Sequence, residues 1–147
     1  MYRGYCFEEL EVGMTASFGK TVTEADLANF AGVSTDFNPL HMDAEFAAGS
    51  RFKQRIAHGM LSGAYLSAVL GMQLPGPGAV YLEQSLRFRA PVHIGDRVVS
   101  RVEVTELMPE KNIATFRTEC LVGKKRVISG EAILMVPSKA AQEAGGE

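Results

Sequence analysis

The stretch GMLSGAYLSAVL, residues 59–70, determines how the rest of the chain must be arranged. It has the length of a long helix and is apolar or small on nearly every helical face. A helix of this composition is expected to be buried all round, so other parts of the chain must wrap around it. Its small residues would let backbone or ligand approach closely, and they are Gly59, Ser62, Gly63, Ala64, Ser67 and Ala68.

After this helix the period of the sequence changes from about 3.6 to 2 residues. The breaker LPGPG, residues 74–78, ends the helical stretch. Apolar and polar residues then alternate over 80–88, and long strands are expected over 98–107, 113–122 and 127–136. The short joints between the last three are typical of hairpin turns. Four long strands in hairpin succession favour an α+β domain with an antiparallel sheet curled on a central helix.

Before the helix, the chain is expected to form a turn and then a strand over 15–22. Thr23 followed by Asp26 is typical of a helix start, because the two side chains can cap each other's backbone N–H groups. This short helix should end near residues 32–34. Asp43 is placed to cap a second short helix.

The length of 147 residues, of which 46% are hydrophobic, predicts a single domain over 1–147, with a small, polar tail from residue 137. The net charge of -2 gives no general attraction to nucleic acid or to an anionic membrane. No apolar run approaches the ~20 residues of a membrane span, and the start has no signal-peptide core. Cys6 and Cys120 have no metal-site spacing and are expected to be buried thiols. These features predict a cytoplasmic protein.

The sequence DFNPLH, residues 36–41, gathers a carboxylate, an amide, a proline and an imidazole. Pro39 fixes its own φ and disfavours a helical Asn38, so residues 36–40 are expected to form an extended or turning loop of defined shape. In such a loop Asp36 and His41 can converge on one water or substrate atom, which suits general acid–base catalysis. The structural alternative is that Asp36 caps a turn and His41 fills a polar gap.

A second candidate feature is the His58-Gly59 step at the start of the long helix. In the first helical turn the Gly59 N–H has no intrahelical acceptor and lies at the positive end of the helix dipole. It would suit a carbonyl oxygen that gains negative charge. The structural alternative is that Gly59 only permits close packing and His58 only caps the helix.

Other classes of site find little support in the sequence. A metal site would draw on Asp36, His41 and Asp43, but no further strong ligand lies at a convincing spacing, so no metal is expected. There is no nucleophile elbow, phosphate-binding glycine loop or dinucleotide fingerprint. Four basic residues near these motifs could meet an anionic carrier such as coenzyme A or simply be solvated: Lys53, Arg55, Arg87 and Arg89.

Together these motifs resemble the (R)-specific enoyl-CoA hydratases of the MaoC-like family, in the short single-domain form that feeds polyhydroxyalkanoate synthesis. The similar segments are DFNPLH (36–41), FA (46–47), IAHGM (56–60), LPG (74–76), YLEQSL (81–86) and PVHIGD (91–96). The similarity extends from about residue 10 to about residue 136. The Asp-x-Asn-Pro-x-His core is the part specific to the family.

The resemblance implies a hot-dog fold and a homodimer, sheet beside sheet, with CoA thioesters bound near the interface. It implies reversible hydration of trans-2-enoyl-CoA to (R)-3-hydroxyacyl-CoA, with no cofactor because the CoA thioester is the substrate. Asp36 would act as the general base on the water, and His41 would orient and activate that water. The Gly59 N–H would polarise the thioester carbonyl and stabilise the enolate.

Three further residues are expected at the substrate site from the same resemblance. Ser67 matches a small hydroxyl residue near the family's pocket, Leu70 lies where acyl length would be limited, and Asn38 belongs to the core motif. Other functions on this architecture stay open. They are an acyl-CoA thioesterase with Asp36 as nucleophile or base, a 3-hydroxyacyl-carrier-protein dehydratase, and a module that binds acyl-CoA or builds a dimer without turnover.

Overall fold

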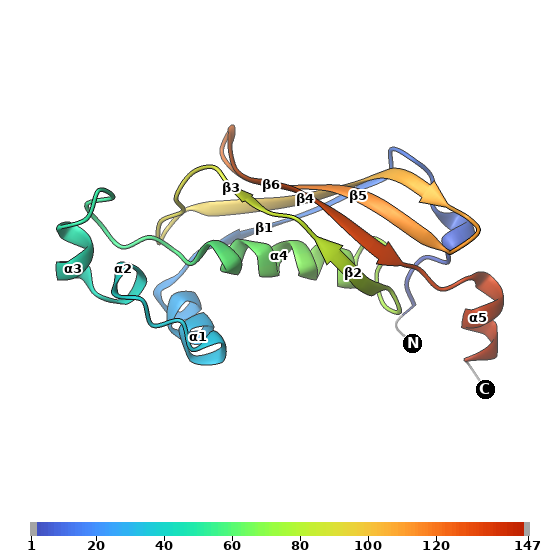
Figure 1. Ribbon diagram of the computed structural model, residues 1–147, viewed down its shortest axis with the longest axis horizontal. Coiled ribbons are helices and arrows are strands. Elements are labelled where there is room, and N and C mark those ends of the chain that lie inside the picture. Colours follow the sequence, from blue (N-terminus) through green and yellow to red (C-terminus); the bar gives the residue numbers. More distant parts are fainter. Residues whose placement is uncertain (1–2, 146–147) are drawn as a thin grey trace.

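The computed structural model describes residues 3–145 of the chain. Along the sequence its elements are η1 (Phe7–Glu9), β1 (Thr15–Thr21), α1 (Glu24–Ser34), α2 (Pro39–Met42), α3 (Ala44–Ala48), α4 (Gly59–Met72), β2 (Val80–Gln84), β3 (Arg87–Phe88), β4 (Arg97–Met108), β5 (Ile113–Val122), β6 (Lys125–Met135) and α5 (Lys139–Ala144). Within the described range the strands form one six-stranded antiparallel sheet, in the order β1-β4-β5-β6-β2, with β3 also on β6. Helix α4 lies along one face of this sheet (Figure 1). The predicted α+β hot-dog arrangement is confirmed.

The strand after the long helix does not pair as its place in the sequence predicts. β4, β5 and β6 form the expected hairpins, but β2 pairs with β6, where Val80 lies opposite Met135. The outer edge of β4 is taken by β1, where Thr21 lies opposite Arg97. The predicted hairpin succession of four strands is therefore wrong at this connection, because β2 joins the open edge of β6. The predicted strand over 80–88 is also divided into β2 and β3, since the ladder with β6 is interrupted between them.

The face of the sheet toward α4 carries the apolar residues that the period of 2 predicts. Val98, Val102 and Val104 on β4 and Phe116 on β5 are fully buried. Charged residues alternate with them on the opposite face. Arg101 pairs with Glu103 along β4, and three pairs cross between strands: Arg101 with Glu119, Arg117 with Glu103, and Arg126 with Glu119. One face of the sheet is thus core and the other meets water.

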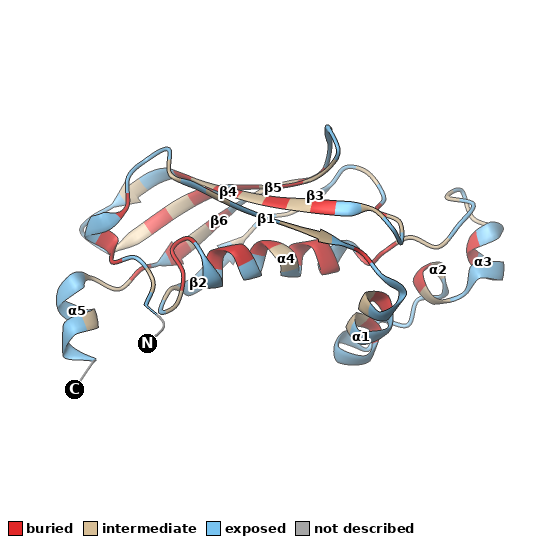
Figure 2. Cartoon of the chain, turned by 180° about the vertical axis from the view of Figure 1, so that it is seen from behind, coloured by how far each residue is buried: buried red, intermediate tan, exposed pale blue. Residues whose placement is uncertain are grey.

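Helix α4 is covered on one side only. Leu66, Val69 and Leu70 are buried against the sheet, whereas Met60 is 56% exposed and Met72 is 65% exposed. Figure 2 shows the buried side of α4 turned toward the strands and exposed residues along its other side. The prediction that α4 is buried all round is wrong for the single chain, because the sheet wraps one side and no element of residues 3–145 covers the other.

Local capping explains the short helices beyond one end of the sheet. In α1 the Asp26 N–H donates to Thr23 Oγ1 at 3.2 Å, and the Thr23 N–H donates to Asp26 Oδ2 at 2.9 Å, as predicted. Asp43 caps α3, also as predicted. The expected loop at 36–40 is only partly confirmed, because Asn38 caps a single helical turn that begins at Pro39. Proline is tolerated there since the first helical N–H needs no acceptor.

The remaining expectations concern the cysteines, the C-terminal segment and membrane insertion. Cys6 and Cys120 are free and buried, as predicted. The segment predicted to be a polar tail contains α5, which Ser138 caps through a hydrogen bond from the Ala141 N–H. No helix within residues 3–145 is both long and apolar enough to cross a membrane.

Candidate active site

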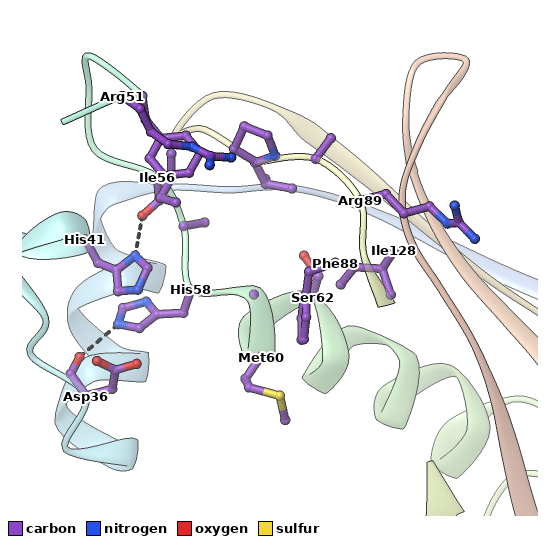
Figure 3. A pocket seen from close by; sticks show the side chains of 16 residues that line it. Asp36, His41, Arg51, Ile56, His58, Met60, Ser62, Phe88, Arg89 and Ile128 are labelled. Atoms are coloured by element: carbon purple, nitrogen blue, oxygen red, sulfur yellow. Dashed lines mark hydrogen bonds between the residues drawn. The ribbon is translucent and has the colours of Figure 1, made fainter. Parts of the chain in front are cut away.

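A cavity of about 400 Å³ lies where the segment before α4 meets α4 and the residues around β3. Its walls are mostly apolar and include Phe52, Ile56, Phe88 and Val92. The polar side chains that line it are those of Asp36, His41, Arg51, His58, Ser62 and Arg89. Figure 3 shows His41, His58 and Asp36 together on one side of the cavity, with Ser62 and Phe88 on the other. An apolar cavity with a few convergent polar groups is typical of a small-molecule site.

Asp36 is placed by a sharp change of direction after α1. Thr35 ends that helix in the left-handed region, with φ 66°. The Asp36 N–H then donates to Ser34 Oγ at 3.1 Å, and Asp36 Oδ1 accepts from the Asn38 N–H at 3.1 Å. One carboxylate oxygen is thus held by the turn, and Oδ2 accepts no hydrogen bond from residues 3–145.

His41 is held on the single turn of α2 and is 9% exposed. Its Nδ1 lies 2.8 Å from the carbonyl oxygen of Ile56. A carbonyl can only accept, so Nδ1 carries a proton, and in the neutral ring Nε2 keeps a lone pair. The backbone is fixed as well, because Arg55 Nε donates to the His41 carbonyl at 2.6 Å and Arg55 also pairs with Glu24 at 2.8 Å.

His58 immediately precedes α4 and is 2% exposed. Its ring stacks on that of His41, with centroids 4.1 Å apart and planes inclined by 31°. Its Nε2 donates to the backbone carbonyl of Asp36 at 2.9 Å. The side chain makes no capping hydrogen bond to α4. Sequence reasoning considered His58 only as a cap and missed these contacts, which depend on the tertiary approach of two distant segments.

Gly59 is the first residue of α4 and lines the same cavity as Asp36 and His41. Its N–H has no acceptor within the helix, and the helix dipole adds partial positive charge at this end. A Cβ at Gly59 would lie 2.6 Å from Cε1 of Phe88, so the ring packs where only glycine leaves room. The amide is therefore a candidate donor to a ligand oxygen.

The side chains of Asp36, His41 and His58 lie close enough together to meet one small ligand. A carboxylate oxygen of Asp36 and a ring nitrogen of each of His41 and His58 lie within 4.8 Å of one another. Two acceptors bridged by one water at normal hydrogen-bond length lie about 4.5 Å apart. The limit of 4.8 Å is compatible with one water shared by Asp36 and His41.

The same three residues form a group with metal-ligating side chains, which sequence reasoning missed because it did not count His58. The two imidazole planes are stacked and inclined by only 31°. An imidazole binds a metal in the plane of its ring, so one ion could not lie in both planes without rotation of a ring. The donor set suits a divalent ion by chemistry, but the stacked arrangement does not suit it. The absence of a metal site stays a prediction.

The other residues expected at the substrate lie outside this cavity. Ser67 lines a second hollow of about 400 Å³ between α4 and β2, together with Met60 and Leu82. Leu70 is buried in the core against the sheet, and Asn38 is exposed and caps α2 through the Leu40 N–H at 3.0 Å.

Of the basic residues considered from the sequence, only Arg89 lines the cavity, where it donates to Ser129 Oγ at 2.7 Å. Arg55 is instead engaged with His41 and Glu24. Arg51, which sequence reasoning did not single out, also lines the cavity and lies over the Phe52 ring at 4.9 Å. Two arginines therefore border a largely apolar space.

Comparison with known proteins agrees with this geometry. Residues 8–129 match the family model described as a MaoC like domain. The chain belongs to the MaoC-like family. The match runs from η1 into β6 and includes every residue that lines the cavity, so the candidate site lies within the MaoC-like domain.

Relatives of this MaoC-like protein include characterised hydratases. An (R)-specific enoyl-CoA hydratase of Rhodospirillum rubrum is 55% identical over 133 residues, which are 90% of this chain and 92% of the relative. The R-hydratase PhaJ1 of Pseudomonas aeruginosa superimposes with a TM-score of 0.87 at 47% identity, over 92% of this chain and 88% of that one. The (R)-hydratase of Aeromonas caviae involved in PHA biosynthesis gives a TM-score of 0.85 at 46% identity, over 88% and 99%.

Proposed function

We propose that this MaoC-like protein is an (R)-specific enoyl-CoA hydratase, which adds water reversibly to trans-2-enoyl-CoA to give (R)-3-hydroxyacyl-CoA. The observation that carries the proposal is the meeting of Asp36, His41 and the Gly59 amide in one cavity. Hydration β to a thioester needs a base for water, an acceptor to orient it and a donor at the carbonyl. The similarity to characterised (R)-hydratases supports the same reaction.

In this mechanism one water lies between Asp36 and His41. One O–H points to the Asp36 carboxylate and the other to Nε2 of His41, which leaves an oxygen lone pair free to attack Cβ. Asp36 takes a proton as the new C–O bond forms, and the electrons of the double bond move toward the thioester oxygen. The Gly59 N–H stabilises this enolate oxygen. The proton taken from water then passes from the Asp36–His41 pair to Cα on the same face, which completes the addition and restores the Asp36 carboxylate.

The reaction proceeds through proton transfers without net oxidation or reduction. We therefore propose that no cofactor is required and that the CoA thioester is the substrate itself. Apolar walls such as Ile56 and Phe88 suit an acyl chain. Arg51 and Arg89 suit the phosphates of the carrier, since arginine is a good partner for phosphate oxygens.

We further propose supporting roles for the residues outside the cavity. Asn38 holds the α2 turn that carries His41, and Leu70 limits acyl length from behind the α4 surface. Ser67 faces the second hollow, where it would meet substrate or a second copy of the chain. Variants at Ser67 and Leu70 should change the preferred chain length or KM more than the rate constant for the chemical step.

We also propose that the protein is a cytoplasmic homodimer. The outer edge of β2 is unpaired within residues 3–145, and exposed apolar side chains lie along it and along α4. These include Val80, Leu82 and Met60. An apolar edge strand of this kind is typically covered by another chain. The two free cysteines fit a reducing compartment. As a polyhydroxyalkanoate-type hydratase it would supply (R)-3-hydroxyacyl units to polymer synthesis.

The proposal is tested by following the loss of enoyl thioester absorbance with crotonyl-CoA and longer substrates. Chiral analysis should give the (R)-3-hydroxyacyl product, with no free thiol released. Release of free thiol without hydration would instead identify a thioesterase, and turnover of carrier-linked substrates alone would identify a carrier-protein dehydratase. His41→Gln should lower kcat by about 10²–10⁴. His93→Gln, which lies outside the cavity, should leave it unchanged.

A further inference from the structure

His58 connects the three parts of the site. Its Nε2 donates to the Asp36 carbonyl at 2.9 Å, its ring stacks on His41 with centroids 4.1 Å apart, and its backbone immediately precedes Gly59. The Phe30 ring of α1 also packs against the His58 ring, with centroids 4.9 Å apart and planes inclined by 59°. His58 therefore contacts the backbone of Asp36 and the ring of His41, and it adjoins the amide donor at Gly59.

The hydrogen bonding of His58 shows what its imidazole contributes. Nε2 carries the proton because its partner is a carbonyl, which leaves a lone pair on Nδ1. Nδ1 is inaccessible and has no hydrogen-bond partner within residues 3–145. An unpaired buried acceptor is destabilising, and a phenyl ring would fill this place without one. The imidazole therefore adds one thing that a phenyl ring lacks, the Nε2–H donor to Asp36.

We infer that His58 is a positioning residue, which fixes the catalytic carboxylate by binding the Asp36 backbone carbonyl. The inference rests on the proposed hydration. The Asp36 segment lies in the loop between α1 and α2, 22 residues away in the sequence, and turns sharply at Thr35. The contact from His58 ties this loop to the start of α4. This hydrogen bond thereby sets the distance between the base at Asp36 and the amide donor at Gly59.

A series of variants separates this role from packing. A glutamine at position 58 places its amide nitrogen the same number of bonds from Cα as Nε2 of histidine, so His58→Gln can keep the donor without the ring. His58→Asn carries the same amide one bond too short to reach Asp36. His58→Phe keeps the ring and the stacking on His41 but has no donor.

The measurement is kcat and KM for crotonyl-CoA hydration, per mole of folded protein. The Gln variant should keep kcat within about threefold, while the Asn and Phe variants should lose about tenfold or more, the range expected when a buried acceptor loses its donor. KM should stay within about twofold in all three, because His58 does not act on the carrier. A Phe variant at least as active as the Gln variant would show a packing role and overturn the inference, as would wild-type kcat in all three.

A second measurement needs no turnover. The ¹³C′ resonance of Asp36 reports the hydrogen bond at its carbonyl, and it should match wild type in His58→Gln and shift in His58→Phe. If the Asn or Phe variant does not fold, a shifted Asp36 resonance in the Gln variant contradicts the inference. Absence of hydration by the wild-type protein would count against the proposed function alone, since the Asp36 resonance would still test the contact.

Discussion

Gly59 combines a packing constraint with a chemical one. A Cβ at this position would lie 2.6 Å from Cε1 of Phe88. The Phe88 ring is 55% exposed and can move, so an added methyl group would displace the ring rather than unfold the chain. A side chain at position 59 should first disturb the backbone N–H that donates to the substrate carbonyl, and the substrate space beside it.

We predict that Gly59→Ala lowers kcat by about tenfold to 10²-fold, because a misplaced backbone donor loses part of its stabilisation of the enolate. The free energy of unfolding should change little. Gly71→Ala is the matched control, since it lies on α4 with nothing within 4 Å of an added Cβ. It should stabilise the protein by about 0.5–1 kcal/mol and leave kcat unchanged. Steady-state kinetics and urea unfolding check both variants, and equal kcat in the two would argue against the amide's role.

The sequence predicted some site residues and missed others for a physical reason. Asp36 and His41 were found because Pro39 and Asn38 restrict the backbone between them, so local chemistry was enough to bring them together. Gly59 was found because a helix start exposes its N–H. The contacts of His58 could not be predicted, since they depend on how the α4 segment packs against a loop far away in the sequence.

At the scale of elements, α1 supports the site from one side because it delivers the chain to Asp36. Its first turn is fixed by the reciprocal caps of Thr23 and Asp26, and Lys20 of β1 pairs with Asp26 at 2.5 Å. Burial raises the pKa of Asp26, but the hydrogen bonds from Lys20 and Thr23 outweigh it and hold the pKa below its ordinary value of 3.8. Folding is therefore coupled to ionisation of this carboxyl group.

The sign of this coupling gives a prediction. The folded-state pKa is depressed, so the stabilisation from Asp26 is fully present above the unfolded-state pKa of 3.8 and is lost as the pH falls through the folded value. Urea unfolding from about pH 5 to about pH 2 should show a smaller loss of stability in Asp26→Asn than in wild type. Identical pH profiles would show that this contact does not contribute.

The elements were predicted best where their signals are local. The caps of α1 and α3, the length of α4 and the alternation of β4 and β5 all follow from neighbouring residues. The position of β2 does not, because either free edge would satisfy its alternation and only the presence of β1 on β4 directs it to β6. The single turn of α2 was missed since a proline is compatible with both a loop and a helix start.

At the scale of the whole molecule, the uncovered side of α4 and the open edge of β2 adjoin each other and together expose apolar side chains to water. Leu82 on β2 is 44% exposed, and the hollow that it lines also contains Met60 and Ser67 of α4. A second copy placed here would pair the strand edge and bury these side chains together. The sequence-based expectation of a helix buried on every face would then hold for the dimer.

We predict that Leu82→Lys weakens self-association by at least about tenfold, because a charged side chain would be buried where an apolar one packs. Analytical ultracentrifugation over a range of concentrations measures the dissociation constant of the dimer. The wild-type protein should sediment with twice the mass of one chain. Val12→Lys changes an apolar residue that is 63% exposed, on a turn before β1, and should leave association unchanged. A monomeric wild type, or equal effects of the two variants, would rule out this interface.

The central claim is that the Asp36 carboxylate takes the proton from water that adds to the enoyl thioester. Asp36→Asn is the direct test, because asparagine keeps the Oδ1 that accepts the Asn38 N–H and so preserves the turn while removing the base. We predict a fall in kcat for crotonyl-CoA hydration of about 10²–10⁴-fold, with an unchanged circular dichroism spectrum. Hydration at close to the wild-type rate by a folded Asp36→Asn protein would contradict the account.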